Sequence, residues 1–205
     1  MDKFINLAED KQTQIIDGAL AAFSANGYKK TSVSDIAAAA GISKAMVFHY
    51  FGTKKDLYLY LIDFGSGIII EAIQEKFDRS ITDFFDRIRM ATAIKIAAME
   101  RHPAILSFFT SVFFESDREV KQEIKAKLAS GEGFRNKLAL EGMDVSKFKD
   151  GVDPKMVMKL LVRYSEGFVN ELPGTAVIDP AVIAEEFEAC IVMLRNNLYK
   201  EEHLI

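Results

Sequence analysis

The stretch TSVSDIAAAAGISKAMVFHYFGTKKDL, residues 31–57, decides the fold of this chain. Ser32 followed three residues later by Asp35 predicts the start of a short helix. Gly41 predicts its end, because glycine readily takes the left-handed conformation that closes helices. Ser43 then predicts the start of a second short helix. Two short helices joined by a tight turn are the pattern of a helix-turn-helix.

The apolar residues of this stretch are spaced so that the two helices can share one small core. They are Ile36, Ala37, Ala40, Ile42, Val47 and Phe51. The small side chains of Ala37 and Ala40 allow the helices to approach closely at the turn. The second helix is left with a mixture of polar and bulky side chains that can meet base edges and phosphates. The stretch therefore predicts a helix that reads DNA.

On both sides of this stretch the chain continues as helices. Upstream, Asn6 with Glu9 forms a weak capping box for a helix over Leu7–Asn26, which Gly27 ends. Downstream, apolar residues recur at helical spacing over residues 53–70, 81–100, 103–115, 117–140, 154–172 and 180–200. No alternating run of β-branched residues interrupts this pattern, so the chain is predicted to be all-α.

Composition and charge are those of an ordinary globular chain with one unusual segment. The 205 residues are 49% hydrophobic and 27% charged, and the formal net charge is -4. An acidic chain is a poor nucleic-acid binder, but residues 18–55 carry five lysines against one acidic residue, Asp35. The positive charge thus falls on the predicted reading segment, as contact with phosphates requires.

Several functional classes find no support in the residues. The only cysteine, Cys190, lies among apolar residues and is interpreted as a small buried hydrophobe. His49, His102 and His203 have no metal-ligand spacing, so no metal or cofactor is expected. No nucleophile elbow, phosphate-binding loop or dinucleotide motif indicates an enzyme. Neither a signal peptide nor a membrane span is recognised, so a cytoplasmic protein is expected.

The predicted helix-turn-helix resembles the DNA-binding segment of the tetracycline-repressor (TetR) family. The matching positions are Thr31, Ile36, Ala37, Ala40, Gly41, Ser43, Tyr50, Phe51, Lys54 and Leu57. The resemblance covers roughly the first 60 residues. It departs at Ala45, where the family often has glycine, and at Phe48, where tyrosine is frequent, which leaves the base preference open.

The resemblance implies a set of DNA contacts. Phosphate is expected at Thr31, Ser32 and Ser34, bases at Lys44, Ala45 and Phe48, and the DNA backbone at His49, Tyr50 and Lys54. The positive end of the first helix would favour the phosphates. For Tyr50, filling the small core is an alternative role, and His49 can be a plain surface residue.

The chain is expected to divide into a DNA-binding domain over residues 1–52 and a helical effector-binding and dimerisation domain over 53–205. In the last helix, Phe187, Ile191 and Leu194 are expected to support a homodimer contact directly or from just beneath it. The apolar surface there is widened by Val182, Ala189, Val192 and Met193. This is more than one core-facing side requires, although an internal helix of a monomer is the alternative.

A surplus of aromatic residues suggests an effector cavity. Eight phenylalanines lie between Phe64 and Phe114, although aromatic residues also commonly fill helical cores. The expected lining is Ile96, Met99, Phe109, Phe113, Phe134, Tyr164 and Phe168. The sequence thus predicts a repressor released from a pseudo-palindromic operator by a small apolar or aromatic effector. The alternative is a DNA-binding regulator without such an effector, controlled by a protein partner.

Overall fold

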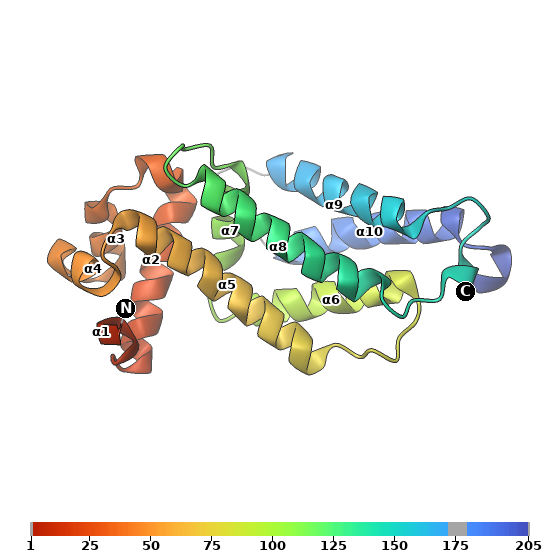
Figure 1. Cartoon of the computed structure of the whole chain (residues 1–205), viewed down its shortest axis with the longest axis horizontal. Coiled ribbons are helices and arrows are strands. Elements are labelled where there is room, and N and C mark those ends of the chain that lie inside the picture. The colour runs from red at the N-terminus through yellow and green to blue at the C-terminus, as the bar shows by residue number, and fades with distance from the viewer. Residues whose placement is uncertain (1, 172–179, 205) are drawn as a thin grey trace. The chain divides into compact units, whose positions relative to one another are not determined.

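The computed structural model describes residues 2–171 and 180–204, and its regular elements in these ranges are helices (Figure 1). They are α1 (Asp2–Ile5), α2 (Glu9–Lys30), α3 (Val33–Ala40), α4 (Lys44–Phe51), α5 (Lys54–Lys76), α6 (Phe84–Met99), α7 (Ile105–Phe114), α8 (Lys121–Leu140), η1 (Val145–Lys147), α9 (Pro154–Glu171), α10 (Pro180–Leu198) and η2 (Glu201–His203). Within the described ranges, backbone pairing of the β type is limited to one bridge between Phe148 and Tyr199. The predicted all-α fold is confirmed.

The start of the first long helix differs from the prediction. The short helix α1 precedes it, and α2 begins at Glu9 with Ala8 at the N-cap and no side-chain cap, so the capping role expected of Asn6 is wrong. Gly27 does interrupt the helix as predicted, because its backbone has φ 67° and ψ 177°. One further helical turn follows it and ends at Lys30.

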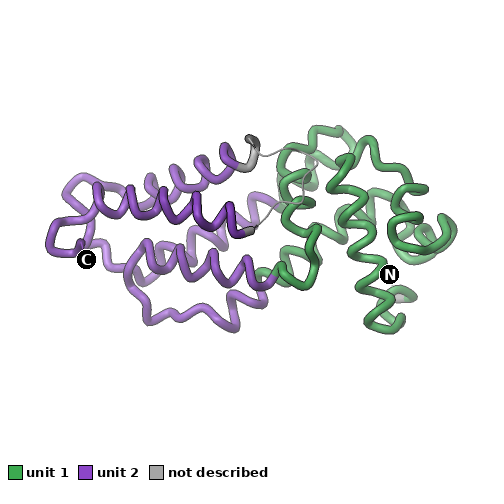
Figure 2. The backbone as a smooth tube through the Cα atoms, turned by 180° about the vertical axis from the view of Figure 1, so that it is seen from behind, with its two compact units in different colours: residues 1–70, 99–127, 173–177 green, residues 71–98, 128–172, 178–205 purple. Residues whose placement is uncertain are grey.

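The chain forms two compact units (Figure 2). The described residues of unit 1 are 2–70 and 99–127, and those of unit 2 are 71–98, 128–171 and 180–204. Helices α5 and α8 each contribute residues to both units. The two compact units thus do not meet at the predicted domain boundary between residues 52 and 53. That boundary separates a DNA-binding from an effector-binding domain, and it stays a prediction.

Aromatic side chains fill the core of unit 1. Phe23 of α2, Tyr58 of α5 and Phe108 of α7 are fully buried. Their rings lie edge to face or tilted, with centroids 4.9 Å apart for Phe23 and Tyr58 and 5.4 Å apart for Tyr58 and Phe108. Each buried apolar side chain of this size stabilises the fold by roughly 1.5–3 kcal/mol. The helix-turn-helix and α7 therefore share one core.

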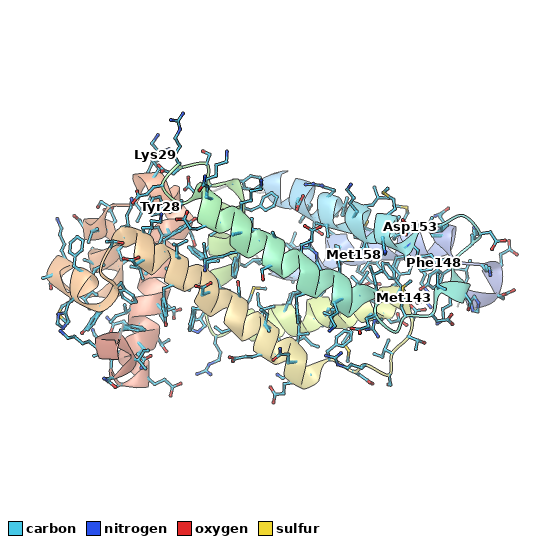
Figure 3. All side chains as sticks on the ribbon, viewed as in Figure 1. Tyr28, Lys29, Met143, Phe148, Asp153 and Met158 are labelled. Atoms are coloured by element: carbon cyan, nitrogen blue, oxygen red, sulfur yellow. The ribbon has the colours of Figure 1, made fainter. Side chains whose placement is uncertain are left out.

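A second, separate core lies within unit 2. Phe85, Phe148 and Tyr199 bring together α6, the segment after η1 and the end of α10, with 4.8 Å between the ring centroids of Phe148 and Tyr199. Met158 of α9 is buried in the same cluster, and Met143 packs against it (Figure 3).

Buried charges complete unit 2. The Asp83 carboxylate caps α6 by accepting the backbone N–H groups of Phe85 and Asp86, and it also accepts the Tyr199 hydroxyl and the Lys147 ammonium, the last at 2.9 Å. The Arg87 guanidinium donates to three carbonyl oxygens, those of Ile81, Leu138 and Glu141. The last two belong to the end of α8, where helical carbonyls lack partners in the helix itself.

Neither a membrane-spanning helix nor a metal-binding cluster is found among the described residues. No helix among them is both long and apolar enough to cross a membrane. Within the same residues no three His, Cys, Asp or Glu side chains gather as a metal ion would require. Cys190 is buried and packs in the core of unit 2.

Candidate DNA-binding site

Side-chain caps set the start of both helices of the helix-turn-helix. The Ser32 hydroxyl accepts the backbone N–H of Asp35 at 3.2 Å, and the Asp35 carboxylate accepts the backbone N–H of Ser32 at 2.8 Å. This reciprocal capping box at α3 confirms the prediction, and its hydrogen bonds from Ser32 hold the pKa of Asp35 below its usual value. At α4 the Ser43 hydroxyl accepts the backbone N–H of Met46 at 3.2 Å.

The turn between the two helices is held by α2. Gly41 has φ 63° and ends α3, as predicted. The Gln14 side-chain amide donates to the carbonyl oxygen of Ala40 at 2.9 Å. A methyl group on Gly18 would lie only 2.5 Å from backbone atoms of Ala39 and Ala40, so a side chain at this position would force α2 and α3 apart. Gln14 and Gly18 were not predicted as part of the site, because neither belongs to a local motif.

The outer face of α4 carries the residues expected at bases. Lys44, Ala45, Phe48 and His49 are exposed, and the Phe48 residue keeps 50% of its surface accessible. A half-exposed phenylalanine is a poor surface residue in water but suits the methyl group of thymine. The opposite face is buried in the unit 1 core through Val47, Tyr50 and Phe51.

Tyr50 fits its alternative role better than a DNA contact. Only 7% of the residue is exposed, and its ring lies edge-on to Phe4 of α1 with the centroids 6.1 Å apart. Of the three residues expected on phosphate, Ser32 is exposed and Ser34 is half-buried. The Ser32 oxygen accepts the capping bond, so its hydroxyl hydrogen is still able to donate to a phosphate.

Thr31 and Lys54 face inward, against the expectation that both contact DNA. Thr31 is 1% exposed, and its hydroxyl lies 2.6 Å from the carbonyl oxygen of Gly27. A hydroxyl so deeply buried cannot reach a phosphate, so that contact is corrected to a structural role. The Lys54 ammonium donates to the carbonyl oxygens of Tyr28 and Thr31 at 2.9 and 3.2 Å and lies 4.1 Å from the Tyr28 ring centroid. A third donor on the ammonium keeps a phosphate contact possible.

The end of α2 supplies cations that were not assigned to DNA. Figure 3 shows Lys29 extending away from the molecule beside the inward-turned Tyr28. Lys29 and Lys30 are both exposed, and they directly precede the capping box of α3. The local excess of positive charge over residues 18–55 was the sequence feature that could have indicated Lys29 and Lys30 as DNA contacts. The Tyr28 backbone N–H donates to the Glu115 carboxylate at 2.7 Å, which holds the chain at this bend.

The residues expected at an effector are divided between the two units. Met99, Phe109 and Phe113 belong to unit 1, where the first two pack against the core and Phe113 is 39% exposed. The other four belong to unit 2 and are Ile96, Phe134, Tyr164 and Phe168. The Tyr164 hydroxyl donates to the Glu186 carboxylate of α10. The set as a whole stays a prediction.

The expected dimer residues lie at the base of an apolar surface. Ile191 is buried in the unit 2 core, and Phe187 and Leu194 pack against that core, so all three lie beneath the outer surface of α10. The exposed large apolar residues on α9 and α10 are Met156, Leu160, Tyr164, Val182, Val192 and Met193. The sequence analysis missed Met156 and Leu160, whose spacing of one helical turn on α9 was the available signal.

Comparison with protein families finds a match for the segment that contains the helix-turn-helix. Residues 15–61 match the model described as "Bacterial regulatory proteins, tetR family". The fatty acid metabolism regulator protein of Bacillus subtilis (strain 168) is 26% identical over 173 residues, 82% of this chain and 84% of that protein. The HTH-type transcriptional regulator HbdR of Aromatoleum sp. (strain CIB) is 23% identical over 197 residues, 92% of this chain and 80% of that protein.

Solved structures agree on the fold. A TetR family transcriptional regulator from Chloroflexus aurantiacus J-10-FL is similar with a TM-score of 0.68 and 20% identity, covering 98% of this chain and 99% of that chain. The fatty acid degradation regulator FadR from Bacillus halodurans is similar with a TM-score of 0.59 and 19% identity, covering 90% and 93%. At this level of identity the likeness concerns the fold, including the helices that follow the matched domain.

Proposed function

We propose that this chain, which belongs to the TetR family of bacterial regulatory proteins, is a ligand-responsive repressor that binds a pseudo-palindromic operator as a homodimer. It is a DNA-binding regulator of transcription and not an enzyme. Beyond DNA binding, the proposal adds four points: repression of transcription, a pseudo-palindromic operator, a homodimer and a small-molecule effector. Such a regulator would act in the cytoplasm, where the operator is.

The observation that carries the DNA-binding part is the exposed face of α4. Lys44, Ala45, Phe48 and His49 share that face, while the capping box of α3, the Ser43 cap of α4 and the Gly18 contact between α2 and α3 set the arrangement. A rigid helix with a cation at its start and an apolar ring further along can contact a phosphate or base edge and a thymine methyl group together.

The outer surface of α9 and α10 supports the homodimer. Six large apolar residues are exposed on these two helices, more than single apolar residues scattered over a monomer require. Two copies joined by a twofold axis would present two α4 helices, so the operator would carry half-sites about one helical turn of DNA apart or slightly more.

The effector part of the proposal is supported by the aromatic surplus and by the name of one relative. The Bacillus subtilis protein is named for fatty acid metabolism, and the hydrocarbon chain of a fatty acid fits the apolar effector expected here. A ligand need prefer the DNA-released state by only about 3 kcal/mol to lower operator affinity roughly a hundredfold. By reciprocity, the operator must weaken binding of that ligand by the same factor.

Operator binding is tested with the full chain and fluorescent DNA fragments from around its own gene. Lys44→Ala should weaken specific binding roughly 5- to 150-fold, the range of one good base contact. Lys125→Ala removes an exposed lysine of α8 and should change nothing. If about eight phosphates are neutralised per dimer, the slope of log affinity against log salt should be near -7. An operator affinity that changes neither with salt concentration nor in Lys44→Ala would contradict the proposal.

The dimer is tested by sedimentation of two matched variants of α10. Met193→Asp places a charge on an outward position with 54% exposure and should dissociate the dimer while each copy stays folded. Met193→Leu keeps the same position apolar and should leave the dimer intact. Leu194→Asp should do more, because the charge would enter the edge of the unit 2 core and unfold it. A dimer that survives Met193→Asp at micromolar concentration would contradict this interface.

A further inference from the structure

Most cationic side chains that are partly buried in unit 2 have a partner. Arg89 pairs with Glu188 at 2.7 Å, and Arg87 donates to three carbonyl oxygens. Lys95 of α6 and Arg135 of α8 differ, since neither side chain has a hydrogen bond or an ion pair within the described ranges. Both residues are half-buried, and the Nε atom of Arg135 is out of reach of water.

The two unpaired cations act on each other. The Nε atom of Arg135 is fully buried without a hydrogen-bond partner. Burial, and after it the positive charge of Arg135, lowers the pKa of Lys95. Like charges that are partly removed from water repel strongly, and a buried donor without an acceptor also destabilises the fold. The pair is therefore unfavourable for the protein alone and becomes favourable when an anion joins it.

Buried apolar residues accompany both cations on their helices. Ala91 precedes Lys95 by one helical turn, and Ala139 follows Arg135 by one turn, so each lies on the same helix face as its cation. Both alanines are buried. Ile94, next to Lys95 in the chain, is buried as well. Small apolar neighbours suit a ligand that carries an apolar body as well as an anionic group.

We propose that Lys95 and Arg135 bind the anionic group, a carboxylate or a phosphate, of an amphipathic effector. The inference rests on the proposed function, since it gives the chemical class of effector that unit 2 takes. An anion between the two side chains replaces their repulsion by charge-assisted hydrogen bonds, and the planar guanidinium of Arg135 matches two oxygens of a carboxylate or phosphate. The effector expected from the sequence was apolar or aromatic, and the structure adds the negative charge.

Three probes separate the anion from the apolar body. Calorimetry on the full chain compares decanoate, 1-decanol and inorganic phosphate. Decanoate should bind at least tenfold more tightly than 1-decanol, which has the same chain without the charge. Lys95→Met and Arg135→Gln should each weaken decanoate binding on the order of 10- to 100-fold, the share of one charge-assisted bond, and leave 1-decanol binding unchanged. Binding of inorganic phosphate with no binding of decanoate would overturn the amphipathic effector.

The stability of the variants without any probe distinguishes a binding role from a structural one. Lys95→Met removes a repelled charge, so its melting temperature should equal or exceed that of the original protein, whereas loss of a structural partner would lower it. Lys137→Met is the control, because it removes an exposed lysine of α8 paired only with Glu141 and should alter neither melting nor decanoate binding. Equal affinity for decanoate and 1-decanol, or full decanoate affinity in both site variants, would overturn the proposal.

Operator binding measured in the same variants keeps this inference separate from the proposed function. Without probe, Lys95→Met and Arg135→Gln should bind operator DNA as the original protein does, because both changes lie outside the helix-turn-helix. If the original protein itself fails to bind DNA, the proposed function is wrong, whatever the probes show. If DNA binding is normal and the charge of decanoate makes no difference, the anion site alone is wrong.

Discussion

The side-chain caps that start the helices of the helix-turn-helix are local, whereas buried polar bonds of unit 2 join distant parts of the chain. The capping partners Ser32 and Asp35 are three residues apart. In unit 2, Asp83 reaches Lys147 across 64 residues and Tyr199 across 116. The caps of the reading helices therefore depend on neighbours in the sequence, and unit 2 depends on pairs that must change together. Each prediction below tests one side of this difference.

The largest expected effect is on the distant bonds of unit 2. Asp83→Asn removes the charge that Lys147 and Arg195 face, and it replaces an oxygen by a donor at the cap of α6. Leaving the half-buried Lys147 without its anion beside this cap should lower the free energy of unfolding by about 3 to 5 kcal/mol. Denaturant unfolding followed by circular dichroism measures this loss.

A matched substitution controls for the loss of a carboxylate. Asp153 is exposed, and its side chain accepts the backbone N–H of Lys155 at the start of α9 (Figure 3). Asparagine caps helices about as well as aspartate, so Asp153→Asn should leave the stability nearly unchanged. Similar losses in Asp153→Asn and Asp83→Asn would contradict the importance of the distant network.

The second effect tests whether the helix-turn-helix also contains a distant requirement. Gly18→Ala would place a methyl group 2.5 Å from backbone atoms of α3, which cannot move as easily as a side chain. We expect a loss of about 1 to 3 kcal/mol in the free energy of unfolding. Gly67→Ala, in α5 with no atom within 4 Å of the added methyl group, should instead stabilise by about 0.5–1 kcal/mol. Equal effects at both glycines would show that α2 and α3 are not closely packed.

These differences explain what sequence reasoning could reach. Capping boxes, the left-handed Gly41 and the apolar spacing of α3 and α4 act over a few residues, so the helix-turn-helix and most helix limits followed from local patterns. The inward positions of Thr31 and Lys54 depend on Tyr28 and Gly27, where α2 bends, and no pattern in the reading stretch contains that bend.

The partners within unit 2 are harder still to predict. Nothing local shows that Arg87 will reach the end of α8 or that Lys95 will lie near Arg135 without a counter-charge. A helical pattern indicates which face of a helix is buried but not which other helix covers it.

The third effect concerns a single local cap. Ser43→Ala removes the side-chain acceptor of the Met46 backbone N–H and should lower the free energy of unfolding by about 1 kcal/mol. Ser43→Asn should restore most of that loss, because asparagine caps helices about as well as serine. Thermal unfolding of the three proteins checks the order. If asparagine and alanine destabilise equally, the cap seen at α4 does not contribute.

The last prediction isolates the charge of Asp83. It concerns how the stability lost in Asp83→Asn varies with pH, a variation that is smallest near neutral pH. Burial alone would raise the pKa of Asp83, but hydrogen bonds from Lys147 and from the Asp86 backbone, with the charges of Lys147 and Arg195, hold it below the usual value. A carboxylate with a lowered pKa stabilises the folded protein fully above its unfolded pKa, about 4, and loses that contribution as the pH falls through the folded pKa.

The stability difference between the original protein and Asp83→Asn should therefore stay constant from pH 7 to about pH 5 and shrink as the pH falls below about 4, where the protonated carboxyl resembles the amide. Denaturant unfolding of both proteins at each pH gives this difference directly. Other carboxylates with lowered pKa values, such as Asp35 and Asp144, are present in both proteins and cancel. A difference that stays constant down to pH 3 would mean that the shape of Asp83, and not its charge, holds α6 in place.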